Sequence, residues 1–147
     1  MILNNYFECK IRYEKAQDNG QNKKINETYL VNAISFGEAE TRIIEEMTPF
    51  IAGEFNITDI KKATYSELFE SEEAAADTYY KIKLVFTTLD EVKGTEKKNA
   101  VNTLARATDL RDAVKTVNEG MKGTMSDYQI ASVVETKIMD IFHLKAE

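Results

Sequence analysis

The sequence predicts an α+β fold in which a strand-strand-helix-strand unit occurs twice. Strand-like alternation and helix-like apolar stripes follow one another in the same order in both halves of the chain. A shift of about 74 residues also aligns the helix-start signals and places Leu30 on Leu104 and Ala39 on Ala113. We therefore expect a sheet of about six mostly antiparallel strands, with two helices on one face.

The first half opens with a pattern typical of a β-hairpin. Residues 5–16 alternate, with Phe7, Cys9, Ile11 and Tyr13 on one face and Glu8, Lys10, Arg12 and Glu14 on the other. The run Asp18-Asn19-Gly20 supplies turn residues that tolerate a positive φ. Residues 24–34 then form the returning strand.

A helix and an extended segment complete the first unit. Ser35-Phe36-Gly37-Glu38 is a capping box, and one apolar stripe continues from it to Met47. Pro49, the only proline, is expected to end this helix. Residues 54–69 are predicted to be extended, with a β-bulge where the alternation breaks near Asp59.

The second half repeats this order. Residues 80–86 alternate, residues 90–98 are polar and contain a turn, and residues 99–108 form the next strand. Asp109 is positioned to cap a helix that ends near Gly120 and Gly123. A last strand covers about residues 128–142.

The two repeats cover about residues 1–70 and 77–143 and are joined by an acidic, Ala-rich connector at residues 70–76. One helix cannot cover a three-stranded sheet alone, so the repeats are expected to share a sheet. The sequence thus predicts a single domain over residues 1–147 that unfolds cooperatively.

Three segments carry a resemblance to a known family. Residues 63–69 (ATYSELF), 79–83 (YYKIK) and 122–142 (KGTMSDYQIASVVETKIMDIF) resemble small uncharacterised proteins of gut Bacteroidota and their phages, a domain of unknown function. The resemblance covers nearly the whole chain and implies a phage or mobile-element origin. It carries no established activity, cofactor or catalytic residue.

Composition limits the chemistry that the chain can perform. A single Cys and a single His exclude a disulfide framework and a metal centre built from several Cys or His. The net charge of −6 disfavours a nucleic-acid partner. No run approaches the roughly 18 apolar residues of a membrane span, and no secretory signal opens the chain. We expect a cytoplasmic protein, in the host cytoplasm if phage-encoded, with no cofactor, metal or membrane partner.

Several chemically interesting residues have a simpler structural interpretation. Cys9 lies on the apolar face of its strand, which indicates a buried side chain and not a reactive thiolate. His143 follows the last apolar residue and is expected to be a half-exposed terminal residue, since nothing marks a catalytic partner. The acidic pairs are expected to be solvated; they are Glu45-Glu46, Glu72-Glu73 and Asp90-Glu91.

The best candidate binding residues are four cations on alternating strands. Lys10 and Arg12 share one strand face, and Lys81 and Lys83 share the matching face of the second repeat. If the helices cover one side of a shared sheet, these cations converge on the open side, beside Leu30 and Leu104. The alternative is a solvated face whose lysines prevent edge pairing.

By elimination, the sequence favours a non-enzymatic binding module. It would use the open sheet face or a strand edge to bind a protein partner or an anionic ligand. A small-ligand protein that binds a nucleotide between the repeats is a second hypothesis. An enzyme that uses scattered carboxylates is a third, and a homo-oligomer is compatible with all three.

Overall fold

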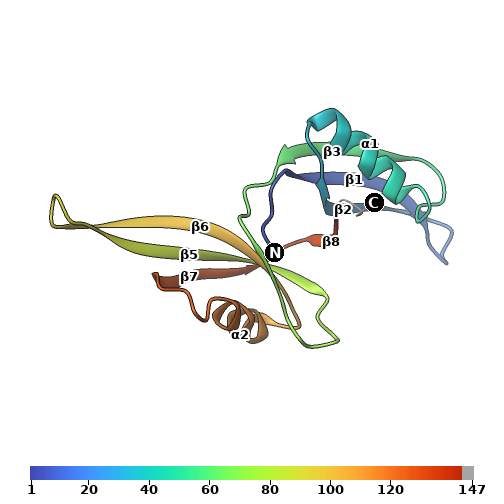
Figure 1. Ribbon diagram of the computed structural model, residues 1–147. Helices are drawn as coiled ribbons and strands as arrows, with labels where there is room; N and C mark the ends of the chain where they lie inside the picture. Colours follow the sequence, from blue (N-terminus) through green and yellow to red (C-terminus); the bar gives the residue numbers. More distant parts are fainter. Residues whose placement is uncertain (144–147) are drawn as a thin grey trace. The chain divides into compact units, whose positions relative to one another are not determined.

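The computed structural model describes residues 1–143, which form eight strands and two helices (Figure 1). In chain order these are β1 (Tyr6–Ala16), β2 (Asn22–Asn32), α1 (Phe36–Met47), β3 (Phe55–Lys62), β4 (Leu68–Glu70), β5 (Thr78–Asp90), β6 (Thr95–Ala107), α2 (Leu110–Gly120), β7 (Asp127–Glu135) and β8 (Ile138–Phe142). The fold is α+β, as the sequence predicted.

The strands form two four-stranded sheets, in the orders β3-β1-β2-β8 and β4-β6-β5-β7. They replace the single sheet of about six strands that the sequence suggested, and each sheet carries its own helix (Figure 1). The difference arises because the segments predicted over 54–69 and 128–142 each divide into two strands. The second piece of each, β4 or β8, pairs in parallel with β6 or β2, whereas all other pairings are antiparallel.

The chain divides into two compact units, and each contains two separate stretches of sequence. The β1 unit contains Asn4–Thr64 and the segment that begins at Lys137, and the β5 unit contains Met1–Leu3 and Tyr65–Thr136. The predicted connector at residues 70–76 therefore lies inside the β5 unit. That the chain unfolds as a single cooperative domain stays a prediction.

The core of the β1 unit is formed by the apolar face of a strand and the apolar stripe of a helix, both visible in the sequence. On the predicted apolar face of β1, Phe7 is buried, Cys9 and Ile11 are fully buried, and Tyr13 is half-buried. Helix α1 packs Ala39, Ile43 and Met47 against this face. The Ser35 hydroxyl accepts a hydrogen bond from Glu38 N at 3.1 Å, which confirms the predicted cap.

The core of the β5 unit is built in the same way. Ile82 and Leu84 of β5 pack against Ala113 and Val117 of α2, and all four are at most 1% exposed. Asp109 caps this helix by accepting a hydrogen bond from Asp112 N at 2.7 Å. Helix α2 ends at Gly120, as predicted.

Two of the edge strands, β3 and β7, each carry a bulge at a matching position. In β3, the pairing passes from Lys10–Asp59 to Ile11–Ile57 and leaves Thr58 unpaired. In β7, it passes from Lys83–Ser132 to Leu84–Ile130 and leaves residue 131 unpaired. The bulge predicted near Asp59 is thus confirmed, and an equivalent one is present in the second sheet.

The sheet faces opposite the helices are not open along their whole length. Leu30 and Leu104, which the sequence placed on an open face, are fully buried. Both residues lie on inner strands of their sheets, β2 and β6. Leu30 is paired with Ile141 of β8, and Leu104 with Leu68 of β4, and both of these partners are buried as well.

The buried thiol of Cys9 gives a direct test of this core. Burial, followed by the charges of Glu8 and Asp59, raises the pKa of Cys9 to about 12. Thiol reagents are therefore expected to label the native protein far more slowly than the urea-unfolded protein. Cys9→Ser is expected to lower the free energy of unfolding by about 1–3 kcal/mol in urea titrations, because the new hydroxyl lies among apolar neighbours. Rapid labelling of the folded chain would contradict this.

Candidate functional site

The four predicted cations lie on two different sheets. Lys10 and Arg12 are exposed on β1. On β5, Lys81 is half-buried and Lys83 is exposed. Within each pair, the two side chains share a face because strand side chains alternate. Convergence of all four on one shared sheet, which the prediction required, does not occur.

The β1 pair lies in a surface of mixed charge. Lys10 is opposite Asp59 in the register of β3. Beside it, Glu8 forms an ion pair with Lys61 at 3.0 Å, and this hydrogen bond and charge raise the pKa of Lys61. Because cations and carboxylates alternate here, this face has little net attraction for an anion.

The β5 pair has no such compensation from its neighbouring strands. Lys81 is paired with apolar residues of β6 and β7, and Lys83 with Asn102 and Ser132. No carboxylate lies directly opposite either lysine in these registers. The β5 face is therefore locally cationic, and the contribution of these lysines to binding stays a prediction.

A cleft of about 930 Å³ lies in the β1 unit, at the far end of the β1–β2 hairpin. Pairing of β1 with β3 stops at Tyr13, whereas pairing with β2 continues to Ala16. The hairpin thus extends past β3, and residues 50–54, the loop from α1 to β3, line the same cleft.

Local interactions fix this loop beside the hairpin. Ile51 is buried, and its N–H donates to Met47 O at 3.2 Å. Phe50 N also donates to Met47 O, at 3.0 Å, so the loop turns tightly off the end of α1. Gly53 has a φ of 95°, a conformation that glycine adopts without strain.

The cleft is lined by three cations and two carboxylates. The cations are Arg12, Lys15 and Lys24, and the carboxylates are Glu14 and Glu54. Arg12 Nε donates to Asn26 Oδ1 at 3.0 Å, which holds the guanidinium toward the neighbouring strand β2. One positive charge is in excess, and it favours an anionic ligand.

Two aromatic residues complete the lining. Tyr13 is half-buried, and burial, together with the hydrogen bond and charge of Glu27, raises the pKa of its phenol. The ring is therefore neutral at physiological pH. Phe50 is 77% exposed, an unusual position for a phenylalanine. The arrangement can contact a planar group with its rings and a negative group with its cations.

Sequence reasoning found Arg12 but missed Lys15, Lys24 and Phe50. The only local signal was an aromatic residue directly after Pro49, in a segment without strand or helix periodicity. That signal identifies a loop but does not identify its neighbour. Only the folded chain places this loop and the hairpin around one cleft.

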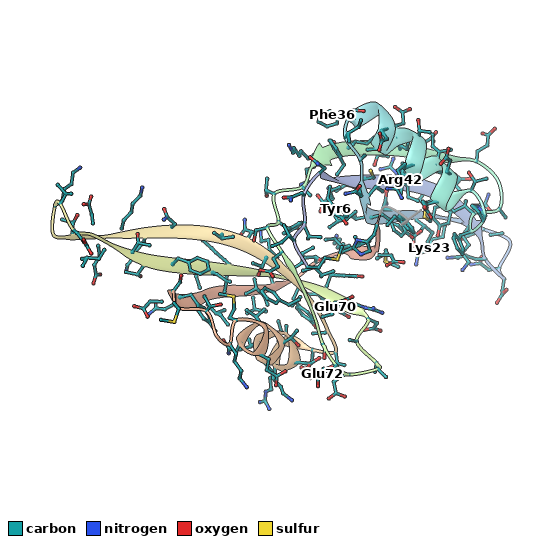
Figure 2. All side chains as sticks on the ribbon, viewed as in Figure 1. Tyr6, Lys23, Phe36, Arg42, Glu70 and Glu72 are labelled. Carbon is teal, nitrogen blue, oxygen red and sulfur yellow. The ribbon has the colours of Figure 1, made fainter. Side chains whose placement is uncertain are left out.

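His143 belongs to a structural cluster at the ends of three strands. The Tyr6 hydroxyl and His143 Nδ1 are hydrogen-bonded at 2.6 Å. Arg42 of α1 donates to the backbone carbonyl of Asn32, and to that of His143 at 3.2 Å. Figure 2 shows Tyr6 and Arg42 in the same unit. His143 is half-exposed, as predicted, and Arg42 joins the ends of β2 and β8 to the helix.

The acidic pairs have separate surroundings. Glu46 forms an ion pair with Arg42 at 3.6 Å. Asp90 accepts hydrogen bonds from Val92 N and Lys93 N and so stabilises the turn between β5 and β6. Within residues 1–143, no group of three His, Cys, Asp or Glu side chains is placed to hold a metal ion. No helix in the same residues is long and apolar enough to cross a membrane.

Comparison with known proteins gives a family but no activity. No curated protein matches the chain. Residues 5–144 match the family described as "Domain of unknown function (DUF4494)". This match includes both helices and all eight strands of the described structure. Since it covers nearly the whole chain, the protein belongs to the DUF4494 family, a domain of unknown function.

Proposed function

We propose that the protein is a non-enzymatic binding module, and that the cleft at the end of the β1–β2 hairpin binds an anionic ligand that carries a planar ring. The observation that supports this is the grouping of Arg12, Lys15 and Lys24 around a concave site. Concavity distinguishes this site from the mixed surface around Lys10, because a cleft desolvates a ligand and strengthens each charge contact.

A nucleotide has both features that the cleft favours. Its phosphates would contact the guanidinium of Arg12 and the ammonium group of Lys24, which share one face of the hairpin. Its base would lie against Phe50, whose exposed ring offers a stacking surface. The volume of about 930 Å³ lies within the roughly 300–1,000 Å³ typical of small-molecule sites.

The proposal predicts which probes bind. In NMR titrations of the ¹⁵N-labelled chain, ATP is expected to shift the amide signals of residues 12–16, 22–24 and 50–56. Adenosine, which lacks the phosphates, is expected to bind more weakly. Reversing two charges, in Arg12→Glu with Lys24→Glu, is expected to weaken ATP binding by about tenfold or more.

A matched variant controls for net charge. Lys97→Glu with Lys98→Glu makes the same charge change on exposed positions of β6, outside the cleft. ATP affinity is expected to stay near that of wild type in this variant. If both double variants lost the same ATP affinity, the loss would be an effect of net charge alone, and the assignment of ATP binding to the cleft would be wrong.

We also infer that the chain arose by duplication of one unit. The orders β3-β1-β2-β8 and β7-β5-β6-β4 correspond strand by strand, and the bulges fall at matching registers. Both helices begin directly after a capping residue, Ser35 or Asp109. Independent origins would not require the same bulge position in both sheets.

The cellular setting that we propose is cytoplasmic and phage- or mobile-element-encoded. The support is the resemblance of residues 63–69, 79–83 and 122–142 to proteins from gut Bacteroidota and their phages. Gene neighbourhood tests this directly. Consistent placement among replication, defence or virion genes would support the origin, whereas chromosomal housekeeping neighbours would argue against it.

A further inference from the structure

The β5 unit contains a second, chemically different cavity. Its volume is about 610 Å³, and it lies where α2 begins and β7 ends. Tyr80 of β5 lines it, together with Leu110 at the start of α2 and Val133 and Val134 of β7. Tyr80 is buried, and Leu110 is 52% exposed. The cavity thus offers an aromatic ring and aliphatic residues within reach of solvent.

The corresponding place in the β1 unit is filled by a ring. Phe7 is opposite the last residue of β3 in the register, as Tyr80 is opposite the last residue of β7. Phe36, the first residue of α1, packs edge-on against Phe7, with ring centroids 4.9 Å apart. Figure 2 labels Phe36 at this end of α1. In the β5 unit, Leu110 takes the place of Phe36, and an open cavity remains beside Tyr80.

Carboxylates outnumber cations among the residues that line the cavity. Asp109 and Glu135 line it, against one cation, Arg111. Burial raises the pKa of Tyr80, and so do the nearby carboxylates, with Glu135 and Asp109 the largest contributors among them. Asp109 Oδ1 accepts the capping hydrogen bond, so that carboxylate also has a structural role. Glu135 is exposed and has the freer carboxylate for a ligand.

We propose that this cavity binds a small organic cation with an aromatic body, an arylalkylammonium. The ring would fill the space that Phe36 occupies in the β1 unit and pack edge-on against Tyr80. The ammonium group would lie toward Glu135, because the charge of Asp109 is largely offset by the N-terminus of α2 that it caps. A neutral analogue would keep the ring contact but lose the charge, and an anionic analogue would be repelled.

Three probes of similar size test the proposal: 2-phenylethylammonium, 2-phenylethanol and phenylacetate. In NMR titrations, the cation is expected to shift the signals of residues 80, 109–111 and 133–135, and to bind more tightly than the alcohol. Phenylacetate is expected to bind weakest. Glu135→Gln is expected to weaken binding of the cation by about three- to tenfold and leave the alcohol unchanged.

Two substitutions at one position separate cavity filling from loss of fold. Leu110→Phe supplies the missing ring from the chain itself and is expected to abolish binding of all three probes. Leu110→Ala leaves the cavity open and is expected to keep binding, with an unchanged spectrum elsewhere. Equal affinity for the cation and phenylacetate, absence of binding to wild type, or full binding by Leu110→Phe would each overturn the proposal. None of these outcomes depends on the cleft of the β1 unit.

Discussion

Cutting the chain within residues 71–76 and separating the fragments is expected to unfold both sheets. The reason is the connectivity of the parallel strands. β4 follows β3 in the chain but pairs with β6, and β8 follows β7 but pairs with β2. Each fragment would therefore carry three strands of one sheet and the fourth strand of the other.

The missing strands carry buried side chains that the sheets cannot easily lose. Leu68 and Phe69 of β4, and Ile138 and Ile141 of β8, are all at most 8% exposed. Burial of each is worth about 1.5–3 kcal/mol, against a total stability of about 5–15 kcal/mol for a typical domain. Loss of two such side chains and of their strand pairing would therefore remove most of the free energy of unfolding.

A specific protease site placed in residues 71–76 of the full chain provides the measurement. The nicked but unseparated protein is expected to keep its native near-UV circular dichroism. Fragments separated in urea and returned to buffer singly are expected to lack it, and mixing them is expected to restore it. A lone fragment with native dichroism and a cooperative melt would refute both this expectation and the predicted single cooperative domain.

Gly120→Ala is expected to lower the free energy of unfolding by about 1–3 kcal/mol, through overpacking. A Cβ at this position would lie 2.4 Å from a ring carbon of Phe69, far inside contact distance. Phe69 is buried in the core of the β5 unit, so its ring cannot move aside without disturbing its neighbours. The expected sign opposes helix propensity, which favours alanine over glycine.

Gly37→Ala in α1 is the matched control for this prediction. Its Cβ would lie 4.0 Å from the nearest atom, the Ser35 hydroxyl oxygen, so the substitution meets open space. It is expected to leave stability unchanged or raise it by up to about 1 kcal/mol. Urea titrations of both variants give the comparison. If Gly120→Ala were as stable as wild type, or if Gly37→Ala lost as much, the proposed clash with Phe69 would be wrong.

The local elements of this fold were predictable because each depends on neighbouring residues. The capping residues Ser35 and Asp109 accept backbone hydrogen bonds within their own helix turn. The alternation of β1 identified its buried face, and a break in alternation located the bulge beside Asp59. The alternation of side chains along a strand and the hydrogen bonds of a helix cap are set by residues close together in the sequence.

The candidate site was predictable only in part. Arg12 was identified because strand alternation exposes it, and it does line a cleft. Lys10, on the same face, lies opposite Asp59 instead. Phe50 was not identified, because a loop residue belongs to no helix or strand periodicity from which its neighbours in the fold could be predicted. Which cations face a cavity depends on contacts between the hairpin and a loop that is distant in sequence.

The sequence by itself determined the fold class, both hairpins, both helices with their starts, and the buried state of Cys9. Only the tertiary structure decided that there are two sheets, and that β4 and β8 each join the sheet built mainly by the other repeat. Short apolar strands such as these have the same pattern whichever partner they pair with. Their choice depends on which sheet offers a free, apolar neighbour, here Leu104 for Leu68 and Leu30 for Ile141, and that is a long-range property of the folded chain.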